Sequence, residues 1–151
     1  MKYWLFKSEP TCYSIDDLAR DGTEHWDGIR NYQARNFMRD KCKVGDQVIF
    51  YHSSCATPGA VGICEITREA YPDHTAWDPN SDHPDPKSTP DNPRWLMVDV
   101  TFKAKFKTPI TLKDMREIPD LSEMQLLKKG NRLSLFPVEK SEFELIQNLG
   151  L

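Results

Sequence analysis

The stretch RWLMVDVTFKAKFK, from Arg94 to Lys107, decides the fold, because apolar residues alternate with other residues along it. Every second residue from Leu96 to Phe102 is apolar, while the positions between them, from Trp95 to Thr101, are mixed. Successive side chains of a strand point to opposite faces, so the apolar set falls on one side of an extended chain. We predict that this stretch is the longest strand and that it crosses the core.

Shorter β-rich runs lie on both sides of this strand. Tyr3–Lys7 is aromatic and leads into a turn, and Gln47–His52 and Ala60–Arg68 are spaced as the two strands of a hairpin. Gly62 lies inside the second of these, where a glycine often marks a bulge or a close backbone approach. We predict a last strand over Arg132–Val138.

Capping patterns and apolar periodicity predict five short helices. Ser14 begins a capping box, Asn31 is a candidate N-cap, and similar patterns begin at Thr111 and Ser122. The predicted helices follow Ser14 and cover residues 31–40, 111–117, 122–129 and 139–148. With five or six strands in mixed order, this pattern is typical of an α+β domain built around a curled sheet.

Composition sets the class of protein. At 151 residues, with 38% hydrophobic and 28% charged residues, the chain suits one globular domain over residues 1–151. No apolar stretch approaches the ~20 residues that a bilayer requires, and the four apolar residues of Tyr3–Phe6 are too few for a signal-peptide core. We expect a monomer without a membrane partner, cytoplasmic or, in a eukaryote, nuclear, with its four cysteines reduced.

The net charge of −3 argues against an indiscriminate binder of polyanions, because nonspecific affinity for DNA comes from many contacts of lysine and arginine with phosphate. Basic residues are nevertheless concentrated in residues 28–50 and 101–132. Any contact with nucleic acid is therefore expected to be local.

Motifs for catalysis or metal binding are weak. No glycine pattern resembles a phosphate-binding loop, and the pair His52 and Cys55 is too common a spacing to indicate a nucleophile. The histidines and aspartates of residues 74–85 are interleaved with prolines, which favours turns over a metal site. We expect a non-catalytic protein with no metal and no cofactor.

The run WDGIRNY, from Trp26 to Tyr32, differs because it alternates aromatic residues with residues that read hydrogen bonds. Trp26 and Tyr32 offer rings for stacking, Arg30 and Asn31 offer hydrogen bonds, and Gly28 permits close approach of the backbone. A planar heterocycle such as a nucleobase requires these groups. The competing interpretation is a core tryptophan beside a surface arginine.

Several motifs in order resemble the EVE domain family, and together they cover nearly the whole chain. They are YWLFKSEP (3–10), WDGIRNYQARNF (26–37), GD (45–46) leading to FYHS (50–53), AYPD (70–73), DPKS (85–88), PRW (93–95) and LLKKGNRLS (126–134). The resemblance implies a PUA-like fold, a small curled β-barrel flanked by short helices and related to YTH domains. It also implies binding of a modified base, such as methylated or hydroxymethylated cytosine, flipped into an aromatic-lined pocket.

Carried over motif by motif, the resemblance places the base pocket at three segments. Its residues would be Lys7, Ser8 and Glu9; Trp26, Arg30, Asn31 and Tyr32; and Tyr51, His52 and Ser53. The partner implied is nucleic acid with a modified base, DNA in preference to RNA. Similar sequences often carry an aromatic pair between Ser81 and Asp85, where this chain has Asp82-His83-Pro84, so His83 or Trp77 would have to supply that wall.

Energetics requires contacts beyond the base. Extruding a base costs a few kcal/mol, whereas one buried methyl group contributes about 0.8 kcal/mol. We therefore expect phosphate contacts, with Arg35, Lys87, Lys128, Lys129 and Arg132 as the candidates. Two alternatives stay open: a reader of modified RNA, and a small-molecule sensor or enzyme in which Arg30 grips an anion and His52 or Glu9 acts as acid or base.

Overall fold

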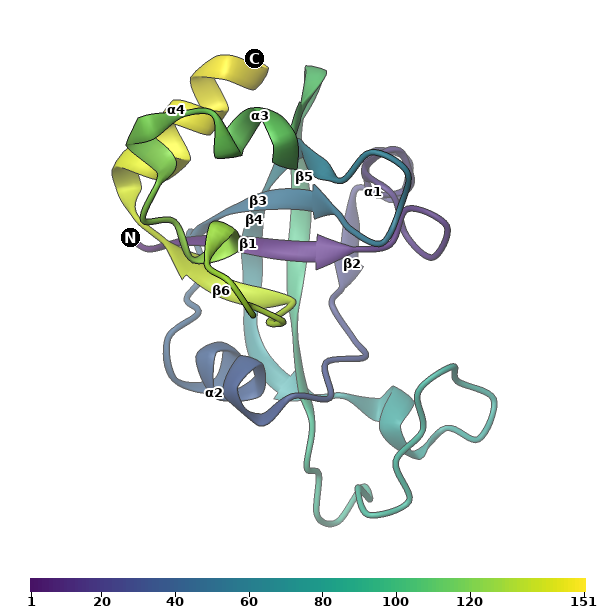
Figure 1. Cartoon of the computed structure of the whole chain (residues 1–151). Coiled ribbons are helices and arrows are strands. Elements are labelled where there is room, and N and C mark those ends of the chain that lie inside the picture. Colours follow the sequence, from purple (N-terminus) through teal and green to yellow (C-terminus); the bar gives the residue numbers. More distant parts are fainter.

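The computed structural model describes the whole chain, Met1–Leu151, as a curled sheet with helices at both of its ends (Figure 1). The strands are β1 (Tyr3–Ser8), β2 (Thr23–His25), β3 (Gln47–His52), β4 (Gly59–Pro72), β5 (Leu96–Thr111) and β6 (Leu135–Val138). The helices are α1 (Ile15–Asp21), α2 (Tyr32–Asp40), α3 (Leu112–Arg116) and α4 (Lys140–Gly150), with three single 3-10 turns, η1 (His74–Trp77), η2 (Pro119–Leu121) and η3 (Gln125–Leu127). None of the helices is both long and apolar enough to cross a membrane.

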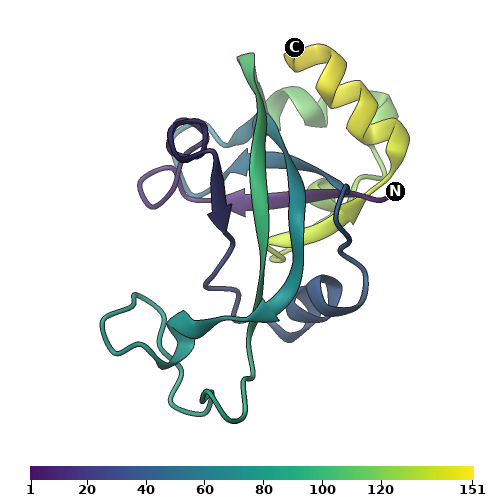
Figure 2. The ribbon, with the colours of Figure 1, turned by 180° about the vertical axis from the view of Figure 1, so that it is seen from behind.

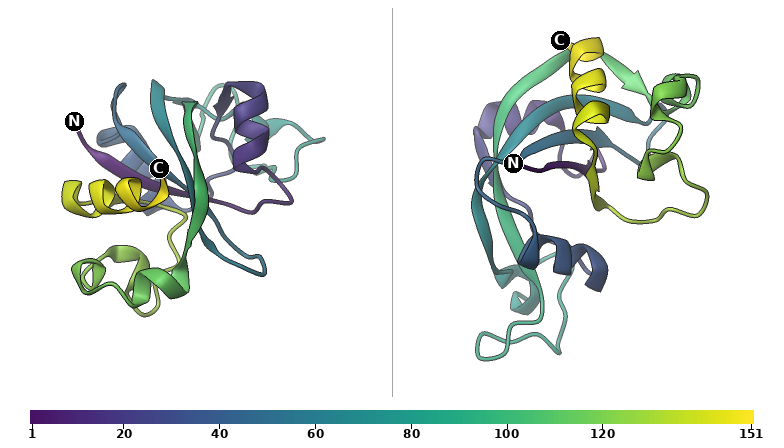
Figure 3. Two further views of the ribbon diagram at one scale, coloured as in Figure 1. Left: turned by 90° about the horizontal axis from the view of Figure 1, so that it is seen from above. Right: turned by 90° about the vertical axis from the view of Figure 1, so that its left-hand side faces the viewer.

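The six strands form one mixed sheet in the order β2-β5-β4-β3-β1-β6. β1 and β3 run parallel and the other neighbours are antiparallel. The register between β4 and β5 shifts four times, and such bulges bend and twist a sheet, as the two views of Figure 3 show. The predicted α+β class is confirmed, although the sheet stays open between β2 and β6, so the barrel is loose.

Gly62 shows why the curl requires a small residue. A Cβ atom at this position would lie 2.5 Å from the carbonyl oxygen of Ala104 on β5 and 2.7 Å from Ile15 Cδ1 on α1. The predicted close approach of backbone at Gly62 is therefore confirmed.

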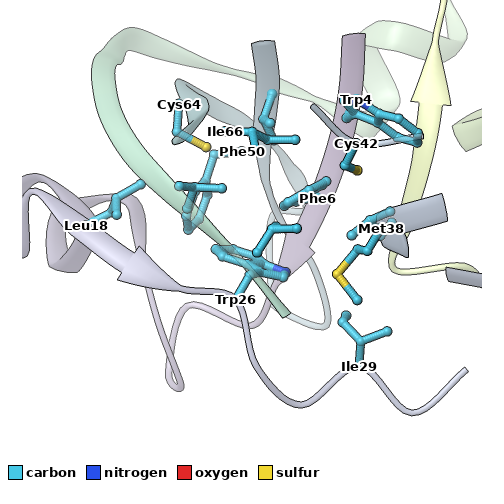
Figure 4. Packing of buried hydrophobic residues seen from close by; sticks show 14 of the residues in the cluster. Trp4, Phe6, Leu18, Trp26, Ile29, Met38, Cys42, Phe50, Cys64 and Ile66 are labelled. Atoms are coloured by element: carbon cyan, nitrogen blue, oxygen red, sulfur yellow. The ribbon is translucent and has the colours of Figure 1, made fainter. Parts of the chain in front are cut away.

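Two apolar cores lie on opposite faces of the sheet. Because side chains alternate along β1, Trp4 and Phe6 join one cluster with α1 and α2, while Leu5 joins the other with α3 and α4. Figure 4 shows the first cluster, in which Trp26 packs beside Phe6. Figure 2 shows α2 and α4 at opposite ends of the sheet.

Most predicted elements are confirmed. The long strand is β5, the hairpin is β3 and β4, Ser14 forms its capping box, and Asn31 caps α2. The prediction for residues 122–129 is wrong, because Ser122 ends η2 and only η3 follows. Leu121, Met124 and Leu126 are all buried there, and their spacing of three and then two residues does not fit one face of an α-helix. The last strand also starts later than predicted, at Leu135.

The segment after β4 contains short regular elements of its own. It extends from the α2 end of the sheet (Figures 1 and 2), and contains η1 and a bridge between Thr89 and Asn92. Asp73 and Ser88 are buried, and Trp95 Nε1 donates to Asp85. We call residues 73–93 the cover loop.

Candidate functional site

A cavity of about 720 Å³ opens where β1 and β3 end. The two strands are parallel and pair Ser8 with His52, so the residues that follow them meet at one edge, where Ser53 N donates to Ser8 O at 3.0 Å. The cavity is lined by Lys7, Ser8, Glu9, Cys12, Tyr13, Glu24, His25, Trp26, Asp27, Gly28, Ile29, Ser53, Ser54, Asp82, His83, Arg132 and Ser134. Of the ten residues predicted for a base pocket, five lie there: Lys7, Ser8, Glu9, Trp26 and Ser53.

Trp26 is both a wall of the cavity and part of the core. Its ring packs 5.4 Å from Phe6 and 5.4 Å from Phe50 between centroids, and only 7% of the residue is exposed. Its backbone N donates to Val98 O on β5 at 2.7 Å. The two interpretations of Trp26 drawn from the sequence therefore describe the same residue, a core tryptophan with one edge at the cavity.

His83 of the cover loop lines the cavity, whereas Trp77 does not. Gly28 has φ +81°, and a Cβ atom on it would lie 2.9 Å from His83 Cε1. His83 Nε2 lies 3.0 Å from Asp27 Oδ2 and 2.9 Å from Thr75 Oγ1. The imidazole of His83 therefore packs directly against the backbone of Gly28, which leaves no room for a side chain at residue 28.

Arg30 holds this wall in place from outside the cavity. Its Nε and Nη2 donate to the carbonyl oxygen of His83 at 3.1 and 2.8 Å, and its Nη1 donates to Asp73 Oδ2 at 3.0 Å. Asp73 also accepts from Gly28 N at 2.9 Å. Burial alone would raise the pKa of Asp73, but hydrogen bonds from Thr75, Gly28 and Arg30 hold that pKa below its usual value. Sequence reasoning placed Arg30 in the pocket; the structure places it behind the pocket wall.

Asn31 and Tyr32 also lie outside the cavity. Asn31 caps α2, and its Oδ1 accepts from Ala34 N at 3.0 Å. Tyr32 is half exposed and stacks on Trp95 at 4.8 Å between centroids, with the guanidinium of Arg35 4.8 Å from its ring. Within the run from Trp26 to Tyr32, therefore, Trp26–Ile29 line the cavity and Arg30–Tyr32 do not.

Tyr51 and His52 are the remaining predicted pocket residues outside the cavity. Tyr51 lies in the core of the other sheet face, where burial raises its pKa to about 12. His52 Nε2 accepts from the backbone N of Ile15 at 3.1 Å, and burial lowers its pKa, so it is neutral. Both side chains are occupied by structural contacts.

The cavity carries more acid than base. Its carboxylates are Glu9, Glu24, Asp27 and Asp82, against the cations Lys7 and Arg132. Burial lowers the pKa of Lys7, whose Nζ lies 5.7 Å from the Phe136 ring centroid. Sequence reasoning missed Glu24 and His25 because they belong to β2, a three-residue strand without apolar alternation.

A second hollow of about 450 Å³ adjoins the cavity, and the two share Arg132. It is lined by Asn31, Gln33, Gln125, Lys128, Lys129, Gly130, Asn131, Arg132 and Leu133. Three of the five residues predicted to contact phosphate lie there. Of the other two, Arg35 donates to Arg94 O and packs on Tyr32, and Lys87 is an exposed residue of the cover loop.

Two aspartates of the cover loop form turns. Asp78 Oδ1 accepts from Asn80 N at 2.9 Å and Asp85 Oδ1 accepts from Lys87 N at 3.0 Å. No three histidine, cysteine, aspartate or glutamate side chains are placed to hold a metal ion. All four cysteines are free thiols.

The EVE domain family model matches residues 2–149. The chain belongs to the EVE domain family. Human thymocyte nuclear protein 1 is 41% identical to this EVE domain over 166 residues, covering 97% of this chain and 73% of the human protein. A crystal structure of a Pseudomonas syringae protein superposes with a TM-score of 0.94 at 46% identity, covering 99% of both chains.

One similar structure contains a ligand. It is the crystal structure of human THYN1 protein in complex with DNA containing 5-methylcytosine, which matches this EVE domain with a TM-score of 0.92 at 40% identity. The match covers 99% of this chain and 98% of the human one. The resemblance of the sequence motifs to the EVE domain is confirmed.

Proposed function

We propose that this EVE domain is a non-catalytic reader that binds DNA and holds a modified cytosine, flipped out of the duplex, in the cavity that Trp26 and His83 line. The observation that carries the proposal is its similarity, over nearly the whole chain, to a human protein whose structure is a complex with 5-methylcytosine DNA. The cavity volume of about 720 Å³ falls in the range of small-molecule sites, roughly 300–1,000 Å³.

The charge of the cavity favours a base with an amino group. Cytosine presents one exocyclic amine as donor, together with ring and carbonyl acceptors. Carboxylates only accept hydrogen bonds, and Asp27 is fixed beside Gly28 by His83. Lys7 and the hydroxyls of Ser53, Ser54 and Ser134 supply donors for the acceptor edge. Thymine and uracil lack the amine and offer these carboxylates only their ring N3–H as a donor.

The methyl mark tunes an affinity that other contacts supply. Burying one methyl group contributes about 0.8 kcal/mol, or roughly fourfold in affinity, while base extrusion costs a few kcal/mol. Contacts with phosphate from Arg35, Lys87, Lys128, Lys129 and Arg132 would cover the difference. Because these contacts are electrostatic, binding weakens as salt rises.

Competition between two duplexes that differ by a single 5-methyl group tests the proposal. We expect wild-type protein to prefer the methylated duplex by roughly fourfold. Trp26→Phe keeps an aromatic core residue but withdraws part of the cavity wall, so it should reduce this preference. Trp77→Phe is the matched control, since Trp77 lies outside the cavity. Equal affinity of the wild type for both duplexes would contradict the proposal.

A further inference from the structure

The second hollow is unusual for its unbalanced charge. Lys128, Lys129 and Arg132 line it, and none of its nine lining residues is acidic. None of these three cations takes part in any ion pair of the structure. The adjoining cavity has four carboxylates among its lining residues. A group with negative charge is therefore repelled by the cavity and attracted by the hollow.

The N-terminus of α2 adds to the positive potential of the hollow. Asn31 and Gln33 of this end line it, and the first N–H groups of a helix carry a partial positive charge and no intrahelical partner. α1, α3 and α4 each place an acidic residue in the first turn, whereas α2 has none. Asn31 caps one N–H of this end, but no acidic residue of the first turn of α2 offsets its partial positive charge.

Asn131 provides an independent sign of a missing acceptor. Its Oδ1 accepts from Gln125 Nε2 and from Leu133 N, both at 3.3 Å. Its Nδ2 is buried, lacks any partner, and is the one such side-chain atom in the structure. Buried donors are nearly always satisfied, and Asn131 lines the basic hollow, where an acceptor on a ligand would satisfy it.

We propose that the second hollow is a phosphate-binding subsite, and that it takes the backbone phosphate of the nucleotide whose base occupies the cavity. The identity of that nucleotide rests on the proposed function, whereas the affinity for phosphate does not. Lys128 and Lys129 supply charge and Asn131 supplies a directed donor. Arg132, shared by both hollows, lies where the sugar would join base to phosphate. Arg35 and Lys87 are not part of this subsite.

Titration of isotope-labelled protein followed by amide NMR shifts tests the subsite. The probes are inorganic phosphate, 5-methyldeoxycytidine, and its 5′- and 3′-monophosphates. We expect inorganic phosphate to shift the amides of residues 128–133 together with those of Tyr32 and Gln33. We expect one of the two monophosphates to bind about tenfold more tightly than the nucleoside, the gain typical of one charge-assisted contact.

Matched lysine variants give the control. Lys129→Ala should remove most of the gain from phosphate while leaving nucleoside binding unchanged. Lys41→Ala, an exposed lysine at the other end of α2, should leave both unchanged. Phosphate shifts scattered over surface lysines, or no gain from either monophosphate, would overturn the subsite.

The two proposals fail separately. If methylated and plain duplexes bind equally while phosphate still shifts residues 128–133, the modified-base reader is wrong and the phosphate subsite stands. If the methylated duplex is preferred but Lys129→Ala and Lys41→Ala behave alike, the reader stands and the subsite is wrong.

Discussion

The two halves of the segment from Trp26 to Tyr32 contribute in different ways. Trp26–Ile29 line the cavity, whereas Arg30–Tyr32 turn away to bind the cover loop, cap α2 and stack on Trp95. In the sequence both halves look like recognition residues. Hydrogen-bonding side chains beside a binding site can therefore serve to hold its walls in position and not to contact the ligand.

The largest expected effect belongs to the second half, Arg30–Tyr32. Arg30→Ala removes the cation paired with the fully buried carboxylate of Asp73, and losing one partner of a buried pair costs about 3 kcal/mol of unfolding free energy. Urea denaturation measures this loss. Arg39→Ala, which breaks an exposed pair with Asp40, is the control and should leave stability nearly unchanged. If the two variants were equally stable, the contacts of Arg30 with Asp73 and His83 would not be what holds the cover loop in place.

Gly28→Ala should affect both stability and binding. The φ of +81° costs an alanine about 1 to 2 kcal/mol, and the new Cβ atom also displaces His83 from the cavity wall. Gly22→Ala is the matched control, since Gly22 has the same φ and open space around it. Only Gly28→Ala should weaken binding of the methylated duplex, and an equal loss in both variants would exclude His83 as a wall.

Asn31→Ala should destabilise the protein by about 1 kcal/mol, the usual cost of a lost N-cap, without changing the preference between methylated and plain duplexes. Ser14→Ala at the N-cap of α1 provides the comparison for stability. Thermal unfolding and duplex competition measure the two effects. If Asn31→Ala lost the preference for the methylated duplex, Asn31 would have to contact the base.

The smallest expected effect is a change in how protein stability depends on pH in the acid range. The pKa of Asp73 in the folded protein lies below its ordinary value of 3.8, so its contribution to stability is complete above about pH 5 and is lost as pH falls from there through the lowered pKa. In Arg30→Ala this pKa is less depressed, and the loss in acid should be shallower. Parallel curves of stability against pH for the two proteins would contradict this role of Arg30.

The sequence predicted features that depend on local chemistry. Ser14 and Asn31 cap helices through side chains three residues from their targets, and β5 follows from its own alternation. β2 could not be predicted, because Thr23–His25 become a strand only by pairing with β5. The orientation of the Arg30 side chain could not be predicted either, because it depends on Asp73, which is 43 residues away in the chain.

The candidate site was predictable only in part for the same reason. Ser8 and Ser53 meet because β1 and β3 are parallel neighbours, and short motifs at strand ends indicated them. The sequence indicates His83 only through its departure from the family pattern at residues 82–84. Its place against Gly28 follows from a long-range fold of the cover loop that no local pattern encodes.

The most direct test of the central claim is the difference between two amide NMR shift maps, recorded with duplexes that differ by a single 5-methyl group on cytosine. Our account predicts that the differences are confined to residues 7–9, 26–29, 53 and 83, which surround the cavity. Differences centred on Asn31 and Tyr32, or no differences at all while both duplexes bind, would contradict it.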